Sequence, residues 1–265
     1  MSIRTSHWPA GVPCWADLTV PDVAVARDFY SAVLGWTFED TAADYGGYVI
    51  GQVDGAAAAG IGPLPQAGMP SAWTLYLASD DVEKTAAAVT ENGGTLLLPP
   101  GNVGPLGRMC IAADPTGAVF GVWEAGTHIG ASVVNQPGGL TWEDLRSTDP
   151  AGAQSFYRSL FGYRIDPLEM AGPDYGLFAL PGEEAPLGGM GGMMGAPEGT
   201  PSHWLVYFGV VDVDTAGAAA QAHGGSVLAP GFDTPFGRMS ALTDPAGAVF
   251  WIAQTDVAAL PDRSG

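Results

Sequence analysis

Positive charge is scarce in this chain of 265 residues. Nine Lys and Arg residues stand against 28 Asp and Glu residues, which gives a formal net charge of −19 at pH 7. Binding to phosphates requires a basic surface, so we expect no nucleic-acid partner. The same charge argues against binding to an anionic membrane surface. We expect the field of the protein to attract cations and to repel acids.

Cysteines and long apolar runs are also scarce. The two cysteines, Cys14 and Cys110, lie beside apolar residues in predicted strands. This pattern excludes a disulfide framework and predicts small buried side chains in a reducing compartment. No apolar run reaches 18 residues, and the first 13 residues contain none long enough for a signal sequence. We therefore predict a soluble, cytoplasmic protein without membrane contact.

The sequence does contain an internal repeat. The segment GPLGRMCIAADPTGAVF (104–120) recurs as TPFGRMSALTDPAGAVF (234–250), and WADLTVPDVAVARDFYSAVLGW (15–36) matches WEDLRSTDPAGAQSFYRSLFGY (142–163). Matches of this length in fixed register indicate a duplication. We predict two modules, at residues 11–125 and 138–256, with the turn-rich segment EAGTHIGASVVNQPGG as a polar linker between them.

Each module shows the same predicted order of elements. A strand at 15–20 or 142–147 ends at Asp22 or Asp149, which suits the N-cap of a first helix. Short strands near 45–50 and 73–78 follow, then a second helix from Asp81 or Asp212, and a final hairpin with the turn DPTG or DPAG. We predict an α+β fold of two tandem βαβββ modules, in which curled mixed sheets form a central cup with helices outside.

These motifs carry a resemblance to a known family. The tandem modules contain D…FY…LG after the first strand, a D-x-x-A start to the second helix and DP-x-G before the last strand. They resemble the vicinal oxygen chelate superfamily of glyoxalase, bleomycin-resistance and extradiol-dioxygenase proteins, and in particular a bacterial two-module subgroup described as glyoxalase-like or hydroxylase-like. The resemblance covers nearly the whole chain, but a fold alone does not fix a function.

The resemblance implies metal ligands on the first, third and last strands, where this chain has other residues. By motif, the positions fall on Trp15, Thr74 and Gly121 in the first module and on Trp142, Leu205 and Trp251 in the second. None of these residues binds a divalent ion as His or a carboxylate does. We predict no metal and no other cofactor. A register slip of two residues would instead place Asp17, Asp144 and His203 as an alternative metal site.

Alternation along the strands predicts an aromatic cleft with a few carboxylates. We expect the ligand-binding residues to be Trp15, Asp17, Tyr76, Trp123, Trp142, Asp144, His203, Tyr207 and Trp251. Such a cleft suits a planar apolar ligand that carries a cation.

Each of these residues also has a structural interpretation. The two first-strand indoles would fill the space of a lost metal, the tyrosine hydroxyls would be satisfied internally, and Asp17 or Asp144 would pair with Arg146. His203 would be a structural histidine, and Arg108 and Arg238 would anchor backbone at strand starts.

Three functions remain open from the sequence. The first, which we favour, is metal-independent binding of a hydrophobic aromatic small molecule, with or without a positive charge, for sequestration, resistance or delivery. The second is a glyoxalase-like or hydroxylase-like enzyme in which Asp17 or Asp144 acts as general base and Tyr76, Tyr207 or His203 polarises a carbonyl. The third is a metalloenzyme with displaced ligands. Whether two copies form a homodimer also stays open.

Overall fold

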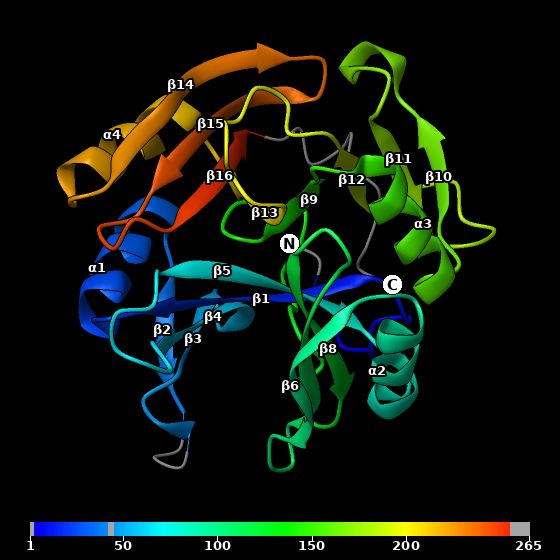
Figure 1. The fold of residues 1–265 in the computed structure, drawn as a ribbon. Helices are drawn as coiled ribbons and strands as arrows, with labels where there is room; N and C mark the ends of the chain where they lie inside the picture. Colours follow the sequence, from blue (N-terminus) through cyan, green and yellow to red (C-terminus); the bar gives the residue numbers. More distant parts are fainter. Residues whose placement is uncertain (1–2, 42–44, 255–265) are drawn as a thin grey trace.

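Two eight-stranded sheets make up the computed structural model, which describes residues 3–41 and 45–254 (Figure 1). The first sheet has the strand order β2-β3-β4-β1-β5-β8-β7-β6, and the second has the equivalent order β10-β11-β12-β9-β13-β16-β15-β14. The predicted α+β fold with curled, unclosed sheets is confirmed. Within each half the βαβββ order occurs twice. The predicted end of the second module, residue 256, lies outside the described residues.

The first half runs from the N-terminal strand to the end of the first sheet. Its elements are β1 (Pro13–Val20), α1 (Val23–Leu34), β2 (Thr37–Asp40), β3 (Val49–Val53), β4 (Ala56–Pro63), β5 (Ala72–Ala78), α2 (Val82–Glu91), β6 (Thr95–Asn102), β7 (Gly107–Ala113) and β8 (Val119–Ala125).

The second half repeats this order. Its elements are β9 (Leu140–Arg146), α3 (Pro150–Phe161), β10 (Arg164–Pro167), the short 3-10 helix η2 (Glu169–Ala171), β11 (Gly176–Ala179), β12 (Gly188–Gly191), β13 (His203–Val210), α4 (Val213–Ala222), β14 (Ser226–Thr234), β15 (Gly237–Thr243) and β16 (Val249–Gln254).

The four helices begin where the sequence predicts. Asp22, Asp81, Asp149 and Asp212 each accept hydrogen bonds from backbone N–H groups of the first turn. These carboxylates satisfy donors that have no partner inside the helix. Gly35 ends α1 in the left-handed conformation, with φ of 72°. None of the helices in the described residues has the length and apolarity that crossing a lipid bilayer requires.

In the central strands of each sheet, such as β1 and β9, one face is more buried than the other. In β1, Ala16 and Leu18 are completely buried, whereas Asp17 and Thr19 on the opposite face are half-buried. Side chains alternate along a strand, so this pattern separates a core face from a face that carries the polar and aromatic site residues. We call the less buried faces of the two sheets the first cup and the second cup.

The core faces of the two sheets meet between the halves of the molecule. Phe29 of α1 lies edge-on to Phe250 of β16, and Phe120 of β8 lies edge-on to Phe156 of α3. Helices α1 and α4 lie side by side, as do α2 and α3 (Figure 1). Each half therefore buries its helices partly against the other half.

The segment between the halves is more buried than the sequence predicts. Ala131 donates its backbone N–H to Cys14 in β1, and Ser132 and Val133 donate to Ala57 in β4. Ala131 and Val133 are fully buried. The prediction of a polar linker is therefore wrong for this segment, because its backbone pairs with the first sheet and its apolar side chains join the core.

Candidate functional site

The first cup is centred on a row of three residues from neighbouring strands. Trp15 of β1 pairs with Tyr76 of β5, and Tyr76 pairs with Gly121 of β8. A Cβ atom at Gly121 would overlap the ring of Tyr76, so the glycine leaves room for that ring to lie across β8. Thr74, the residue that the motif alignment gives for this row, lies two pairs further along, opposite Asp17.

A carboxyl group with two tyrosine partners forms the polar centre of the first cup. The Tyr76 hydroxyl donates to Asp17 Oδ2 at 3.0 Å, and the Tyr48 hydroxyl donates to the same atom at 3.5 Å. Trp15 Nε1 in turn donates to the Tyr48 oxygen at 2.9 Å. Burial raises the pKa of Asp17 to about 7, and the two hydrogen bonds offset this effect only in part. Asp17 is therefore partly protonated near neutral pH.

His128, from the segment between the halves, covers one side of the first cup. Its ring lies edge-on to Trp15, with 4.6 Å between the ring centroids, and 5.8 Å from Trp123. Trp123 Nε1 donates to the backbone oxygen of His128 at 2.9 Å, which fixes the segment in this position. Burial lowers the pKa of His128 to about 4, so the ring is neutral at physiological pH.

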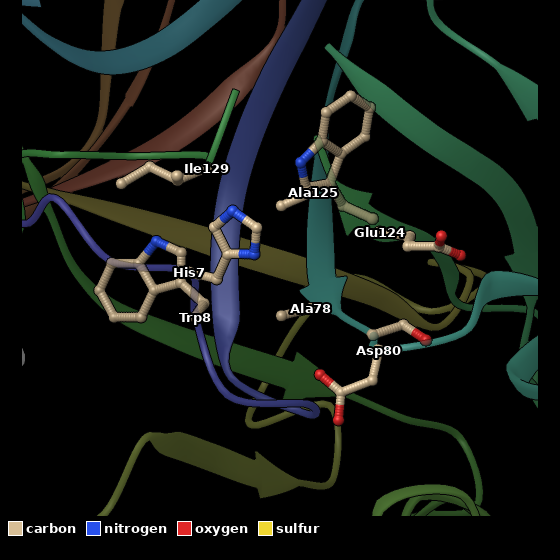
Figure 2. A pocket seen from close by; sticks show the side chains of 9 residues that line it. His7, Trp8, Ala78, Asp80, Glu124, Ala125 and Ile129 are labelled. Atoms are coloured by element: carbon tan, nitrogen blue, oxygen red, sulfur yellow. The ribbon is translucent and has the colours of Figure 1, made fainter. Parts of the chain in front are cut away.

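A small cavity of about 190 Å³ lies at the end of the first cup (Figure 2). It is bounded by the ends of β5 and β8, the N-terminal segment and the segment that carries His128. Its lining residues are His7, Trp8, Ala78, Ser79, Asp80, Trp123, Glu124, Ala125 and Ile129. The Trp123 ring contacts both this cavity and His128, so the cavity is a neighbour of the Asp17 cluster and does not contain it.

The second cup repeats the arrangement with one added charge. Tyr175 donates to Asp144 Oδ1 at 2.7 Å, and Tyr207 donates to Asp144 Oδ2 at 3.2 Å. Arg146 Nη2 contacts Asp144 Oδ2 at 2.5 Å, so this carboxylate is ion-paired. The position of Arg146 is occupied by Thr19 in β1, because both residues pair with the corresponding glycine of the neighbouring strand.

Aromatic rings surround this polar centre. Trp142 of β9 pairs with Tyr207 of β13, which pairs with Trp251 of β16. The rings of Tyr207 and Trp251 are stacked, with 5.3 Å between centroids and 25° between planes. Phe232 lies edge-on to Trp251 and is 43% exposed, while Trp142 and Trp251 are half-buried. The second cup therefore has a partly exposed aromatic surface.

Two glycines make room for the tyrosines that the sequence analysis missed. A Cβ atom at Gly60 would overlap the hydroxyl of Tyr48, and one at Gly189 would overlap the hydroxyl of Tyr175. Both glycines pair with the aspartate of the cup, in β1 or β9. Each Tyr ring therefore crosses a strand that has no side chain at that point, and its hydroxyl reaches the carboxyl group.

The residues of the cups do not fit a divalent metal ion. In the first cup a single carboxyl group stands with two tyrosines, whose pKa values are raised well above the usual range by burial, so the phenols stay protonated. In the second cup a guanidinium already occupies the carboxylate. Throughout the described part of the chain, no three His, Cys, Asp or Glu side chains gather where they could hold a metal ion.

The structure places the nine predicted site residues in two groups. The first sheet holds Trp15, Asp17, Tyr76 and Trp123, and the second sheet holds Trp142, Asp144, His203, Tyr207 and Trp251. Because Asp17 lies on a different sheet from Asp144 and His203, the alternative metal site has no structural basis.

His203 lies at the rim of the second cup, opposite Arg146, where its Nδ1 atom is 2.8 Å from the backbone oxygen of Pro201. Arg108 and Arg238 lie outside the groups of residues around Asp17 and Asp144. Arg108 pairs with Glu83 of α2, and Arg238 pairs with Asp214 of α4.

The chain matches the family model for the Glyoxalase/Bleomycin resistance protein/Dioxygenase superfamily at residues 14–122 and again at 130–252. A protein of Mycobacterium tuberculosis, CFP32, described as a candidate glyoxylase, is 38% identical over 255 residues, which is 93% of this chain and 96% of the relative. The anthracycline biosynthesis protein DauV of Streptomyces sp. (strain C5) is 35% identical over 266 residues, with 94% and 95% covered.

Solved structures share the fold at low sequence identity. The Mn(II)-bound glyoxalase from Novosphingobium aromaticivorans superposes with a TM-score of 0.65 at 16% identity, covering 93% of this chain and 83% of the other. The 2,3-dioxygenase LapB from Pseudomonas sp. KL28 also gives 0.65, at 17% identity, with 92% and 93% covered. The repeat, the paired sheets and these matches show that the chain belongs to the glyoxalase, bleomycin-resistance and dioxygenase superfamily, the vicinal oxygen chelate fold.

Proposed function

We propose that this protein binds a hydrophobic, planar aromatic small molecule without a metal ion, for sequestration or delivery, and that the second cup is the binding face. The observation that carries the proposal is the aromatic surface formed by Trp142, Tyr207, Trp251 and Phe232, of which three rings are partly exposed. Stacked and edge-to-face contacts favour a flat ring system there. The Asp144 carboxylate, which two tyrosine hydroxyls hold in place beside these rings, would orient the ligand.

The relatives support a ligand of this kind. DauV, by its name, takes part in anthracycline biosynthesis, and anthracyclines contain planar fused rings. A role in binding aromatic metabolites is consistent with a chain that covers nearly the whole of such a relative and whose described residues include no fitting set of metal ligands.

The two cups differ in the ligand charge that they favour. Arg146 neutralises Asp144, so a ligand on the second cup needs no positive charge. The cationic part of the prediction belongs to the first cup, where both hydrogen bonds to the Asp17 carboxyl group come from neutral tyrosine hydroxyls. The net charge of −19 would favour the approach of cations to either cup.

Native mass spectrometry of freshly purified protein, together with elemental analysis, tests the proposal. We expect a retained organic molecule, or binding of added naphthyl compounds, without a stoichiometric metal ion. Trp251→Ala should weaken binding of these compounds about tenfold in calorimetry, because a stacking surface is lost. Leu97→Ala is the matched control, since Leu97 is exposed on β6 of the first sheet. A stoichiometric transition metal, or equal binding by wild type and Trp251→Ala, would contradict the proposal.

Acid–base catalysis in the first cup is the second candidate. A carboxyl group whose pKa is raised to about 7 suits proton transfer near neutral pH, and Tyr76 is placed to hydrogen-bond to a carbonyl. An enzyme of this kind would lose turnover in Asp17→Asn while it retained binding to the second cup. A binding protein would bind the same compound and return it unchanged.

We also propose a cytoplasmic location and a small-molecule partner rather than nucleic acid. Both cysteines are free and buried, which suits a reducing compartment. Fractionation of the native host, with detection of the full-length chain, would check the location.

A further inference from the structure

Arg146 stands out in the second cup because its guanidinium contacts a carboxylate through one terminal nitrogen and a thioether sulfur through the other. It lies on β9 two residues after Asp144, and 11% of its side chain is exposed. The Nη2 atom contacts Asp144 at 2.5 Å. The group also lies 5.7 Å from the centre of the Tyr175 ring, a cation–π distance. These contacts hold the guanidinium in place beside the aromatic rings.

The other edge of Arg146 is covered by a weak partner. Its Nη1 atom contacts the sulfur of Met194 at 2.5 Å. A thioether sulfur is a poor acceptor, whereas arginine N–H groups bind oxygen acceptors strongly. Met194 lies after β12 in a glycine-rich stretch, is 56% exposed and has a backbone φ of 45°. Residues other than glycine rarely adopt that conformation, so the contact is made by an exposed side chain on a locally strained backbone.

The first cup has no equivalent of this arrangement. Thr19 occupies the position of Arg146, and Gly121 occupies the position of Trp251. A strong donor with a displaceable partner and a neighbouring aromatic surface therefore occur together only in the second of the two cups.

We propose that Arg146 is the specificity-determining residue of the second cup, and that its Nη1 edge binds a carbonyl or carboxylate oxygen of the aromatic ligand in place of the Met194 sulfur. This inference rests on the proposed function and adds to it the polar group that the ligand must carry. Asp144 keeps the guanidinium in position, so the ligand gains a directed hydrogen bond as well as stacking. Aromatic amines of the same size gain only the stacking.

A pair of probes with the same ring separates these effects. Naphthoate carries a carboxylate, and naphthylmethylamine carries an ammonium group in its place. Calorimetry at pH 7.5 should show that Arg146→Gln weakens naphthoate binding at least about tenfold, as the loss of a charge-assisted hydrogen bond implies. Naphthylmethylamine should bind the variant equally or more tightly, since Asp144 is then unpaired. Arg146→Lys should keep part of the naphthoate affinity.

Removal of the competing sulfur gives an independent test. Met194→Ala should bind naphthoate more tightly than wild type, because the Nη1 edge no longer has a partner to displace. Arg164→Gln is the control for loss of an arginine, since Arg164 is exposed and paired with Asp166 in β10, the edge strand, which β11 and β12 separate from β9. It should leave both affinities unchanged.

The outcomes distinguish failure of this inference from failure of the proposed function. If both probes bind wild type and Arg146→Gln weakens them equally, or Met194→Ala weakens naphthoate, Arg146 has only a packing role and the inference is overturned. If neither probe binds wild type, the proposed function fails and the inference fails with it. Should Arg146→Gln not fold, as judged by circular dichroism, Arg146→Lys and Met194→Ala decide between the same outcomes.

Discussion

Asp17 and Asp144 show how one neighbour changes a carboxyl group. Both accept hydrogen bonds from two tyrosine hydroxyls, and both pair with a glycine on the next strand. Only Asp144 has an arginine at 2.5 Å. Burial without a cation raises the pKa of Asp17 to about 7, whereas Asp144 is held in an ion pair with Arg146.

Replacement of Asp17 by Asn should change the pH dependence of stability. Because the folded-state pKa of Asp17 lies above its unfolded value, the folded state binds a proton that the unfolded state releases between about pH 4 and pH 7. This group therefore makes wild type less stable as the pH rises through that window. The amide of Asp17→Asn does not titrate, so the difference in Tm between variant and wild type should move in favour of the variant from pH 5 to pH 8.

Thermal melts at several pH values measure this difference. Asp166→Asn is the control, since that carboxylate is exposed and ion-paired in β10. A Tm difference for Asp17→Asn that stays constant with pH would mean that Asp17 has an ordinary pKa in the folded protein.

Gly60 is a second position at which a small change, the addition of one methyl group, should affect stability. Gly60→Ala should destabilise the protein by about 1–3 kcal/mol, because the added methyl group overlaps the Tyr48 hydroxyl and forces it away from Asp17 and Trp15. Urea unfolding measures the loss. Gly101→Ala on the edge strand β6, where the nearest atom to a new Cβ is 3.9 Å away, should change stability far less. Equal effects of the two substitutions would show that the Tyr48 position does not depend on Gly60.

Elements with strong local signals could be predicted from the sequence. The four aspartate N-caps and the DPTG and DPAG turns depend on interactions within a few residues, so they are visible without the fold. Strand β4 gives no such signal. Its sequence AAAAGIGP has only one branched residue, Ile61, and its two glycines, Gly60 and Gly62, lie under the Tyr48 ring, a contact that is set by tertiary structure.

The tyrosine partners were missed for a related reason. The three letters DYG occur at residues 44–46 and at 174–176, which aligns Tyr45 with Tyr175. In the structure Tyr48 is the residue that corresponds to Tyr175, because each hydroxyl reaches the aspartate of its own cup. The hydrogen-bonding role follows from strand register, and short motifs do not determine register.

The segment between the halves contains a buried histidine whose titration affects stability. His128 packs against Trp15 and Trp123, and burial lowers its pKa to about 4. Its folded-state pKa lies below the unfolded value of about 6.5, so the unfolded state binds an extra proton and wild type loses stability as the pH falls from about 6.5 to 4. His128→Phe removes this loss while it keeps a ring at the site. Its Tm relative to wild type should rise as the pH falls through that range.

Asp17 has the opposite effect to His128 on how stability changes with pH. Over the same range Asp17 favours the folded state at low pH, so the two groups partly cancel in wild type. His7→Phe, at the rim of the cavity, is the matched control. If it reproduced the effect of His128→Phe, the titration could not be assigned to the first cup.

Across the whole molecule, the two halves share their core through equivalent contacts. Tyr30 of α1 accepts a hydrogen bond from Trp73 and lies 3.4 Å from Asp244 of the other half. Tyr157 of α3 accepts the corresponding bond from Trp204 and packs against Phe120 of the other half. The rings that one half presents are thus covered by the other half, so the core faces of both halves are buried in part by contact with each other.

We therefore predict that the halves unfold in a single cooperative transition. Calorimetric and van't Hoff enthalpies should agree, and near-UV and far-UV circular dichroism should give the same urea midpoint. Phe250→Ala should lower the free energy of this single transition by about 3–5 kcal/mol, since Phe250 of β16 is fully buried and packs against Phe29 of α1. Two separated transitions would show that the halves are independent domains.

The core that the two halves share also constrains how this architecture can vary. A change in the aromatic packing between the halves must be matched by a change in the partner half. A side chain in one cup, by contrast, can change while the corresponding side chain in the other cup stays the same. Thr19 against Arg146 and Gly121 against Trp251 are exchanges of this one-sided kind. A duplicated scaffold can in this way keep one copy as a rigid support while the other acquires a new chemical preference.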